Sequence, residues 1–271
     1  MNAMHHTLEK PNRRTMIAMA MSAAATLPAT ARSLAAIPAP APGMKFMSLL
    51  VRKDGIDAET FRDEWLRVHA PLALGIPHLR GFVLSEIVPP HPEQGLGSIP
   101  ALPQIAGIST SWWDSSETRD AARQTPEMKA WVAHGNKILD REKSLSITLG
   151  ENVVSRPQTE GTVKRVGLMR RKAGTSHDDC MRYWMDIHVP MAADVPGLRG
   201  FIVSECVGPS APADIDGIVE TWWDSVADRE QHLATPGGRA WNADGRLFLD
   251  IPGSRGIFAV DRTIIPAPTW A

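Results

Sequence analysis

The sequence predicts an α+β fold in which two copies of one βαββαβ unit close into a single antiparallel barrel within the chain. Two observations lead to this prediction. A large set of residues recurs at constant spacing, which indicates an internal duplication. Within each copy, short apolar runs with strand character and amphipathic helical segments follow one another in the same order.

The duplication has two spacings. In the N-terminal part of each copy, matching residues lie 119 positions apart, as Trp65 and Trp184 do. Further along, the spacing is 110 positions, as between Trp113 and Trp223. The difference, 119 − 110 = 9 residues, indicates an insertion in the first copy. It falls in the Pro- and Gly-rich segment 88–104, which is typical of a surface loop.

Residues 1–43 are predicted to form an export leader and spacer. Arg13 and Arg14 precede an uncharged run at 16–31, rich in Ala and Met, which ends on a small-x-small cleavage pattern. This segment resembles a twin-arginine leader, so we expect a periplasmic protein; a cytoplasmic protein with an N-terminal extension is the alternative. The run is too short and too weakly apolar for a lasting membrane span, and residues 37–43 are typical of an extended Pro-rich spacer.

The first copy spans residues 44–155 and the second spans residues 161–263. Each copy is predicted to contain four strands, because its short apolar runs are bounded by turn residues. The expected strands are residues 46–51, 81–88, 105–113 and 145–154 in the first copy, and residues 163–169, 200–207, 215–223 and 256–260 in the second.

An amphipathic helix that carries Trp and His follows the first strand of each copy, at residues 61–71 and 180–190. Four residues separate Trp from His, so both rings lie on one helix face. A Pro two residues after the His is expected to limit the helix. Asp57 and Ser176 are expected to cap these helices. A second helical region should begin at Asp114 in the first copy and be broken by a Thr-Pro pair.

The order βαββαβ is that of the ferredoxin-like unit, which places both helices on one face of a four-stranded sheet. The other face must be covered, and a tethered duplicate can cover it sheet against sheet. We therefore expect a closed barrel within one chain, with the helices outside it. Each layer between helices and sheet can then hold a cleft with an imidazole at its mouth.

Together these motifs resemble the EthD domain, a branch of the dimeric α/β-barrel superfamily. The resemblance covers residues 44–154 and 163–261. Single-domain members dimerise, so the resemblance implies a tandem, pseudo-dimeric version, and it also allows a homodimer of the tandem chain. It rests on a strand followed by Arg-Lys-x-Gly, on Trp-x-x-x-His-x-Pro in the helix, and on Pro-x-Leu-Arg-Gly-Phe, Trp-Trp-Asp-Ser and Thr-Pro.

The superfamily to which this resemblance points has many activities. It includes cofactor-free oxygenases, isomerases, polyketide cyclases, and decarboxylases or dehydratases that act on aromatic substrates. It also includes haem enzymes. Because one fold hosts many chemistries, the activity has to be argued from the residues of the site.

The first candidates for chemistry are His69 and His188, because a neutral imidazole can take and return a proton at neutral pH. The structural alternative is that each His bonds a backbone carbonyl at its helix end. Tyr183 is the only tyrosine in the chain, and the matching residue of the first copy is Glu64. Its phenol is a candidate donor to a developing oxyanion, or else an amphipathic surface ring.

Tryptophans, arginines and two polar helix residues are candidates for substrate binding. The tryptophans could stack on a flat substrate, although a large ring on a helix is more often core. The arginines could bind a carboxylate or form salt bridges with Glu86 and Glu205. Asn136 with Asp140 could orient a histidine, or the helix face could be solvated. The candidates are Trp65, Trp184, Trp113, Trp223, Arg80, Arg199, His134 and Asn136.

Composition and motifs argue against several classes of function. The formal net charge is −1, so no basic face for nucleic acid is indicated. We find no metal-ligand spacing, phosphate loop, dinucleotide fingerprint or nucleophile elbow, and we expect no metal and no membrane contact after leader removal. Cys180 and Cys206 are interpreted as two buried thiols, with a disulfide as the alternative.

The leading hypothesis is a cofactor-independent lyase-type enzyme. Its substrate would be a small aromatic or apolar molecule, and its reaction would be C–C cleavage, decarboxylation or dehydration. His188 or His69 would act as the acid/base. Tryptophans would form the walls, and Tyr183 or an Arg would hold an oxygen. Two alternatives stay open: a haem-binding oxidoreductase of the same superfamily, with a helix-borne His as iron ligand, and a non-catalytic ligand-binding protein.

Overall fold

The computed structural model describes residues 43–88, 105–208 and 212–269. These residues belong to one compact unit. The predicted leader and spacer lie outside the described residues, as does most of the predicted insertion. None of the helices in these three ranges is long and apolar enough to cross a membrane.

The two copies contain the same elements in the same order, as the sequence predicts. The first copy contains β1 (Met44–Leu50), α2 (Ala58–Asp63), η1 (Glu64–His69), α3 (Ala70–Leu72), η2 (Ala73–Gly75), β2 (Leu79–Ile87), β3 (Gly107–Trp113), α4 (Ser116–Ala122), α5 (Pro126–Ile138) and β4 (Leu145–Ser155). The second copy contains β5 (Val163–Met169), α6 (His177–Tyr183), η3 (Trp184–His188), α7 (Val189–Met191), η4 (Ala192–Asp194), β6 (Gly200–Cys206), β7 (Gly217–Trp223), α8 (Val226–Leu233), α9 (Pro236–Phe248) and β8 (Arg255–Ile265).

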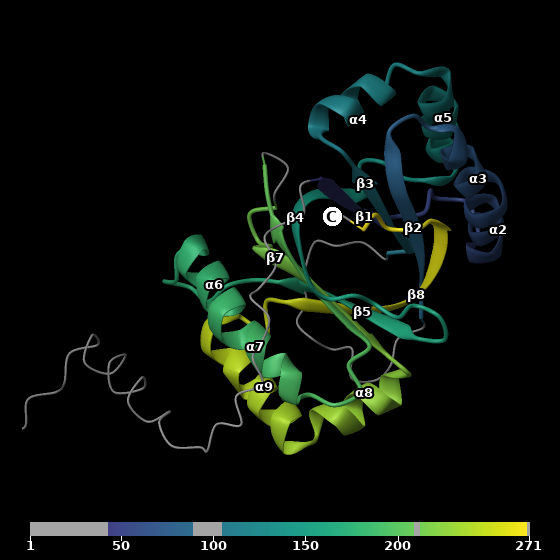
Figure 1. Cartoon of the computed structure of the whole chain (residues 1–271). Coiled ribbons are helices and arrows are strands. Elements are labelled where there is room, and N and C mark those ends of the chain that lie inside the picture. The colour runs from purple at the N-terminus through teal and green to yellow at the C-terminus, as the bar shows by residue number, and fades with distance from the viewer. Residues whose placement is uncertain (1–42, 89–104, 209–211, 270–271) are drawn as a thin grey trace, which may run out of the picture. The chain divides into compact units, whose positions relative to one another are not determined.

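The strands form one closed antiparallel barrel in the order β1-β3-β2-β8-β5-β7-β6-β4 (Figure 1). Each copy contributes four neighbouring strands, and the copies join at two seams. At each seam the last strand of one copy pairs with the second strand of the other: Val83 lies opposite Thr263, and Asn152 lies opposite Val203. Closure pairs both edges of each four-stranded sheet. The predicted barrel within one chain is therefore confirmed.

The helices lie outside the barrel, where α2 to α5 cover the strands of the first copy and α6 to α9 cover those of the second (Figure 1). Because successive side chains of a strand point to opposite faces, each Trp-Trp pair is divided between the two sides of the sheet. Trp112 and Trp222 hydrogen-bond carboxylates inside the barrel. Trp113 and Trp223 belong to the cores under the helices.

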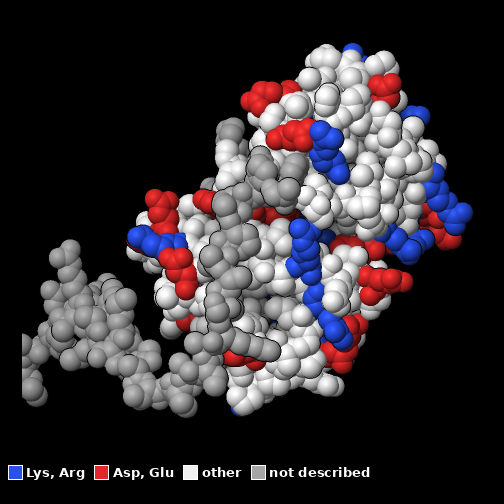
Figure 2. Space-filling model, in the orientation of Figure 1, with Lys and Arg blue, Asp and Glu red and all other residues white. Residues whose placement is uncertain are grey.

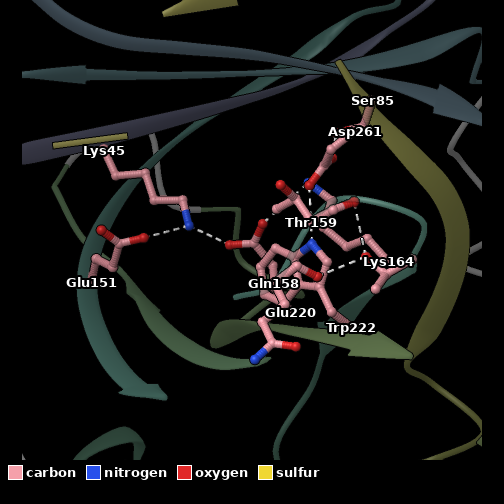
Figure 3. Close-up of polar contacts among 10 residues, drawn as sticks. Lys45, Ser85, Glu151, Gln158, Thr159, Lys164, Glu220, Trp222 and Asp261 are labelled. Carbon is pink, nitrogen blue, oxygen red and sulfur yellow. Dashed lines mark hydrogen bonds and ion pairs between the residues drawn. The ribbon is translucent and has the colours of Figure 1, made fainter. Parts of the chain in front are cut away.

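A chain of buried charges crosses the barrel interior, and the sequence analysis did not foresee it (Figure 3). Lys45 bonds Glu151 at 2.7 Å and also bonds Glu220. Lys164 lies 3.4 Å from Glu220 and 2.8 Å from Asp261. Burial opposes the charge of Lys45, but the attraction of its two carboxylate partners is stronger and raises its pKa. These pairs join strands of both copies.

The Trp/His helices contain a wider turn at the His. The backbone N–H of Ala70 bonds the carbonyl of Trp65, and that of Val189 bonds the carbonyl of Trp184, so each bond spans five residues. The following Pro lacks an N–H and its ring crowds the carbonyl four residues earlier, which a wider turn relieves. The helix therefore passes through the Pro and runs to Gly75 in the first copy. The expectation that Pro limits the helix was wrong.

The helix caps follow the short polar side chains. Asp57 and Ser176 accept bonds from the backbone three residues on, as predicted. The start predicted at Asp114 was one residue early, because Ser115 is the cap and forms a capping box with Thr118. The carboxylate of Asp114 instead binds an arginine.

Candidate active site

The layer between sheet and helices in the second copy holds a cleft of about 620 Å³. Its floor comes from β5, β7 and β8, and its roof comes from η3, α8 and α9. The residues that line it include Trp184, His188, Trp223, Trp241, Arg165 and Gly256. This cleft combines aromatic walls, an imidazole and charged groups, which is the composition expected of a small-molecule site.

His188 is held by a carboxylate on the facing helix. Its Nδ1 lies 2.7 Å from Oδ2 of Asp244, and the other oxygen of Asp244 accepts a bond of 2.7 Å from the hydroxyl of Tyr183. With the proton on Nδ1 shared with the carboxylate, Nε2 carries a lone pair. Nε2 has no hydrogen-bond partner among the described residues, and His188 lines the cleft. The imidazole is thus oriented with its basic nitrogen free.

The surroundings keep the imidazole uncharged. Burial lowers the pKa of His188, and the nearby Asp244 partly offsets this by favouring the charged form. Burial and Asp244 also raise the pKa of Tyr183 to about 12, so its hydroxyl stays a donor. A neutral imidazole backed by a carboxylate can accept a proton, because Asp244 stabilises the imidazolium that results.

Aromatic packing fixes the plane of the imidazole. The ring of Trp241 stacks on His188 with centroids 5.2 Å apart and an angle of 14°, and its Nε1 donates to the His188 carbonyl. Phe248 contacts the same imidazole edge-on at 5.1 Å. A ring clamped on two sides loses little freedom when a ligand binds, which favours a defined catalytic geometry.

In the first copy, the space beside the matching histidine, His69, is filled. A Cβ placed on Gly135 would lie 2.6 Å from Nη2 of Arg141 and 3.1 Å from Cε1 of His69, so the arginine fills the space beside this imidazole. At the matching Gly245, only His188 lies within 4 Å of the added atom. The residue that matches Arg141 is Ile251, which lines the open cleft.

His69 is poorly placed for proton transfer. Its Nδ1 is buried without a partner among the described residues, and so is Nδ1 of the neighbouring His134. Burial, His134 and Arg141 lower the pKa of His69 to about 3. His69 does not line the second cleft, of about 480 Å³, that lies under the first-copy helices. The two predicted acid/base histidines are therefore not equivalent.

The remaining predicted site residues differ in whether they line the cleft. All four predicted tryptophans are buried in the cores under the helices, and Trp184 and Trp223 also line the second-copy cleft. Tyr183 does not line the cleft, and its hydroxyl bonds Asp244. In place of the predicted contact with a substrate oxyanion, Tyr183 positions the carboxylate of Asp244.

The predicted polar binding residues have protein partners. Arg80 forms a bidentate pair with Asp114, and Arg199 pairs with Asp224 in the same way. The expected alternative partners, Glu86 and Glu205, were wrong: Glu86 binds Arg62 and Arg262, and Glu205 bonds His177.

The predicted pair Asn136 and Asp140 does not share a helix, because α5 ends at Ile138, and it does not orient a histidine. Asn136 lines the first-copy cleft and accepts a bond from Arg141, while Asp140 pairs with Lys143. His134 bonds Glu64 at 3.1 Å through Nε2. Asp140 lies in the turn after α5, where it also accepts a bond from the backbone N–H of Lys143, so the solvated helix face does not describe it either.

Sequence reasoning missed three contributors to the second-copy site. These are Asp244, Trp241 and Arg165, none of which was a predicted site residue. The available signal was spacing: Trp241, Asp244 and Gly245 lie three and four residues apart, so they share the α9 face toward η3.

Within the described ranges, no group of His, Cys, Asp and Glu could hold a metal ion. Cys180 and Cys206 are buried free thiols, and burial raises their pKa to about 11 and about 12. On the face seen in Figure 2, basic and acidic side chains lie beside each other.

Comparison with solved structures shows the fold. An anthrone oxidase-like protein is 13% identical with a TM-score of 0.55, over 86% of this chain and all (100%) of that one. A proposed monooxygenase from Lactobacillus acidophilus is 13% identical with a TM-score of 0.51, over 82% and 94%. A proposed chlorite dismutase is 14% identical with a TM-score of 0.50, over 82% and 96%. No curated protein matches the sequence.

The sequence pattern of the EthD domain matches residues 53–142 and 172–252, one segment in each copy. The two matches cover more than half of the chain and include both Trp/His helices. An enzyme-type function is compatible with this fold, since neighbours of the same architecture carry enzyme names. The chain therefore belongs to the EthD family, as a tandem two-copy member.

Proposed function

We propose that this protein is an acid/base enzyme whose single active site is the second-copy cleft. Its substrate is a small, flat aromatic molecule, and its chemistry is of the lyase type. The observation that carries this proposal is the placement of His188: Nδ1 is held by Asp244, while Nε2 is free in a cleft walled by tryptophan.

The proposed chemistry follows from the pairing of His188 with Asp244. In a dehydration, Nε2 of His188 takes a proton from a substrate carbon, the C–H electrons form the new double bond, and the C–O bond breaks. The imidazolium returns the proton to the departing hydroxide, which leaves as water. Asp244 stabilises the imidazolium in between, and Trp241 keeps the ring in plane. The protein ends the cycle unchanged, and no outside oxidant is needed.

A pair of matched variants tests this proposal. H188Q should lower turnover by about 10²- to 10⁴-fold, the usual contribution of a positioned acid/base. H69Q, the matching change in the first copy, should leave turnover near the parent value. Substrates come from a screen of small hydroxylated and carboxylated aromatic compounds, followed by product mass. Full turnover in H188Q would refute the proposal, and ligand binding without product would support a non-catalytic binding protein.

One alternative has a specific observation in its favour. A histidine with a free Nε2 and a carboxylate on Nδ1 is also the usual arrangement of a metal-bound histidine, so His188 is the residue that would hold a haem in this cleft. Haem, when bound there, would supply redox chemistry. Protein produced with haem supplied should then show a Soret band that H188Q lacks. We propose the acid/base enzyme first because Asp244 and Trp241 hold His188 in the position and plane that proton transfer needs.

A further inference from the structure

An arginine without a partner lies on the floor of the cleft. Arg165 is on β5, lines the cleft, and is partly buried. It makes no hydrogen bond or ion pair with any described residue, whereas Arg80 and Arg199 each hold a carboxylate. An enclosed cation without a counter-charge is costly, so such a group in a cleft points to an anionic ligand.

The sheet is shaped to hold this guanidinium. A Cβ placed on Gly256 would lie 2.7 Å from Nη2 of Arg165 and 3.0 Å from its Cζ, with no other side chain among its nearest atoms. On Gly167 an added Cβ would lie 2.8 Å from Nη1 of Arg165, and it would also meet Val219 at 2.6 Å and Met169 at 2.9 Å. Gly167 and Gly256 are opposite each other in the β5–β8 ladder. The guanidinium therefore lies over two facing glycines that leave room for it.

The first copy lacks all three features at the matching positions. Arg165 corresponds to Phe46, which is covered by the guanidinium of Arg119 at 4.0 Å. The two glycines correspond to Ser48 and Ser146, which are also opposite each other and share a hydrogen bond of 2.7 Å. Arg165, Gly167 and Gly256 thus occur together in one copy and are all absent from the other. A dedicated binding site requires this combination, whereas packing of the sheet alone does not.

The charge of the cleft supports the same conclusion. Four arginines and one glutamate line it, a formal charge of +3. Arg229 and Glu230 are successive residues of α8, and their formal charges cancel. Arg239 and Arg246 are exposed residues at the rim of the cleft. Burial and the repulsion of Arg229 lower the pKa of Arg165 to about 9, so its charge would gain from an anion. The inner part of the cleft is left with one positive charge to balance.

We propose that the substrate of this cleft is an aromatic carboxylate, with its carboxylate bound by Arg165 and its ring between the tryptophans near His188. This inference rests on the proposed active site. A carboxylate carries the single charge that Arg165 balances and matches the two-pronged edge of a guanidinium. Trp184 and Trp223 supply apolar walls in the same cleft. A phosphate ester would bring a second charge.

Calorimetric titration of the full chain with benzoate, 1-naphthoate, benzamide and phenyl phosphate tests this proposal. The carboxylates should bind more tightly than benzamide, their neutral isostere. In R165Q, carboxylate affinity should fall about 10- to 100-fold, the worth of a charge-assisted pair, while benzamide affinity stays within about two-fold. G256A, which keeps every charge but displaces the guanidinium, should reproduce the loss. R119Q is the control: it removes the guanidinium that covers Phe46 in the first copy, and it should bind like the parent.

The proposal is overturned if neither carboxylate binds at millimolar concentration, if benzamide binds as well as benzoate, or if R165Q and G256A retain parent affinity. Tighter binding of phenyl phosphate would overturn the choice of carboxylate. Circular dichroism of each variant separates loss of binding from loss of fold. H188Q should still bind benzoate: carboxylate binding with full turnover in H188Q removes the acid/base function, whereas loss of turnover in H188Q without carboxylate binding removes only the substrate class.

Discussion

Replacing Lys45 by Met should destabilise the barrel more than an ordinary core substitution. Lys45 is 1% exposed, and its two partners, Glu151 and Glu220, are 4% and 2% exposed. Without the ammonium group, Glu220 keeps only Lys164, at 3.4 Å, and Glu151 keeps only the indole N–H of Trp112, so among the described residues the carboxylate of Glu151 has no cation beside it in the barrel interior. Removing one partner of a buried ion pair costs about 3–5 kcal/mol in the free energy of unfolding, because the remaining charge is uncompensated.

Urea unfolding followed by circular dichroism measures this cost directly. At about 2–4 °C per kcal/mol for a chain of this size, K45M should also melt about 6–20 °C lower than the parent. The deficit should shrink at acid pH, where protonation removes the uncompensated charge. In the parent the lysine has a raised pKa, so its ion-pair stabilisation is complete below pH 10.5, the ordinary value, and is lost only above it.

A second substitution separates the charge effect from the packing effect. E151Q in the K45M background removes the uncompensated charge of Glu151 and keeps an acceptor for Trp112, so the double variant should regain part of the lost stability. The buried charges do not hold the two copies together if K45M lowers the free energy of unfolding by less than about 1 kcal/mol, or if the loss is equal at acid and neutral pH.

Two further predictions concern the cleft. I251R places in the second copy the arginine that fills the space beside His69 in the first, so ligand binding and turnover should both fall at least 10-fold while the melting temperature changes little; unchanged binding would contradict the account of the two copies. D244N removes the charge that favours protonated His188. Since burial already lowers this pKa below 6.5, the acid limb of kcat/KM should lie below pH 6.5 in the parent and lower still in D244N, with reduced kcat at neutral pH. An acid limb that moves upward in D244N would show that the carboxylate does not act on the imidazole.

Much of the architecture could be predicted from the chain alone, because it rests on local patterns that occur twice. The spacing of Trp65 and His69 and its repetition at Trp184 and His188 identified the duplicated helix. Short apolar runs located the strands to within a few residues, apart from the last strand, which continues to Ile265. The predicted end of each helix at the Pro was wrong, because a wider turn accommodates the Pro and the helix continues past it.

The sequence by itself determined the duplication, the order of strands and helices, and the presence of an imidazole and tryptophans on one helix face. Only the tertiary structure decided which copy has a histidine that lines its cleft, since that depends on Arg141 reaching His69 and on Ile251 leaving His188 free. It also decided that Asp244 holds His188 and that Arg165 lies over Gly256. Such contacts join residues far apart in the chain, and a pattern within one segment carries no information about the neighbours that folding brings to it.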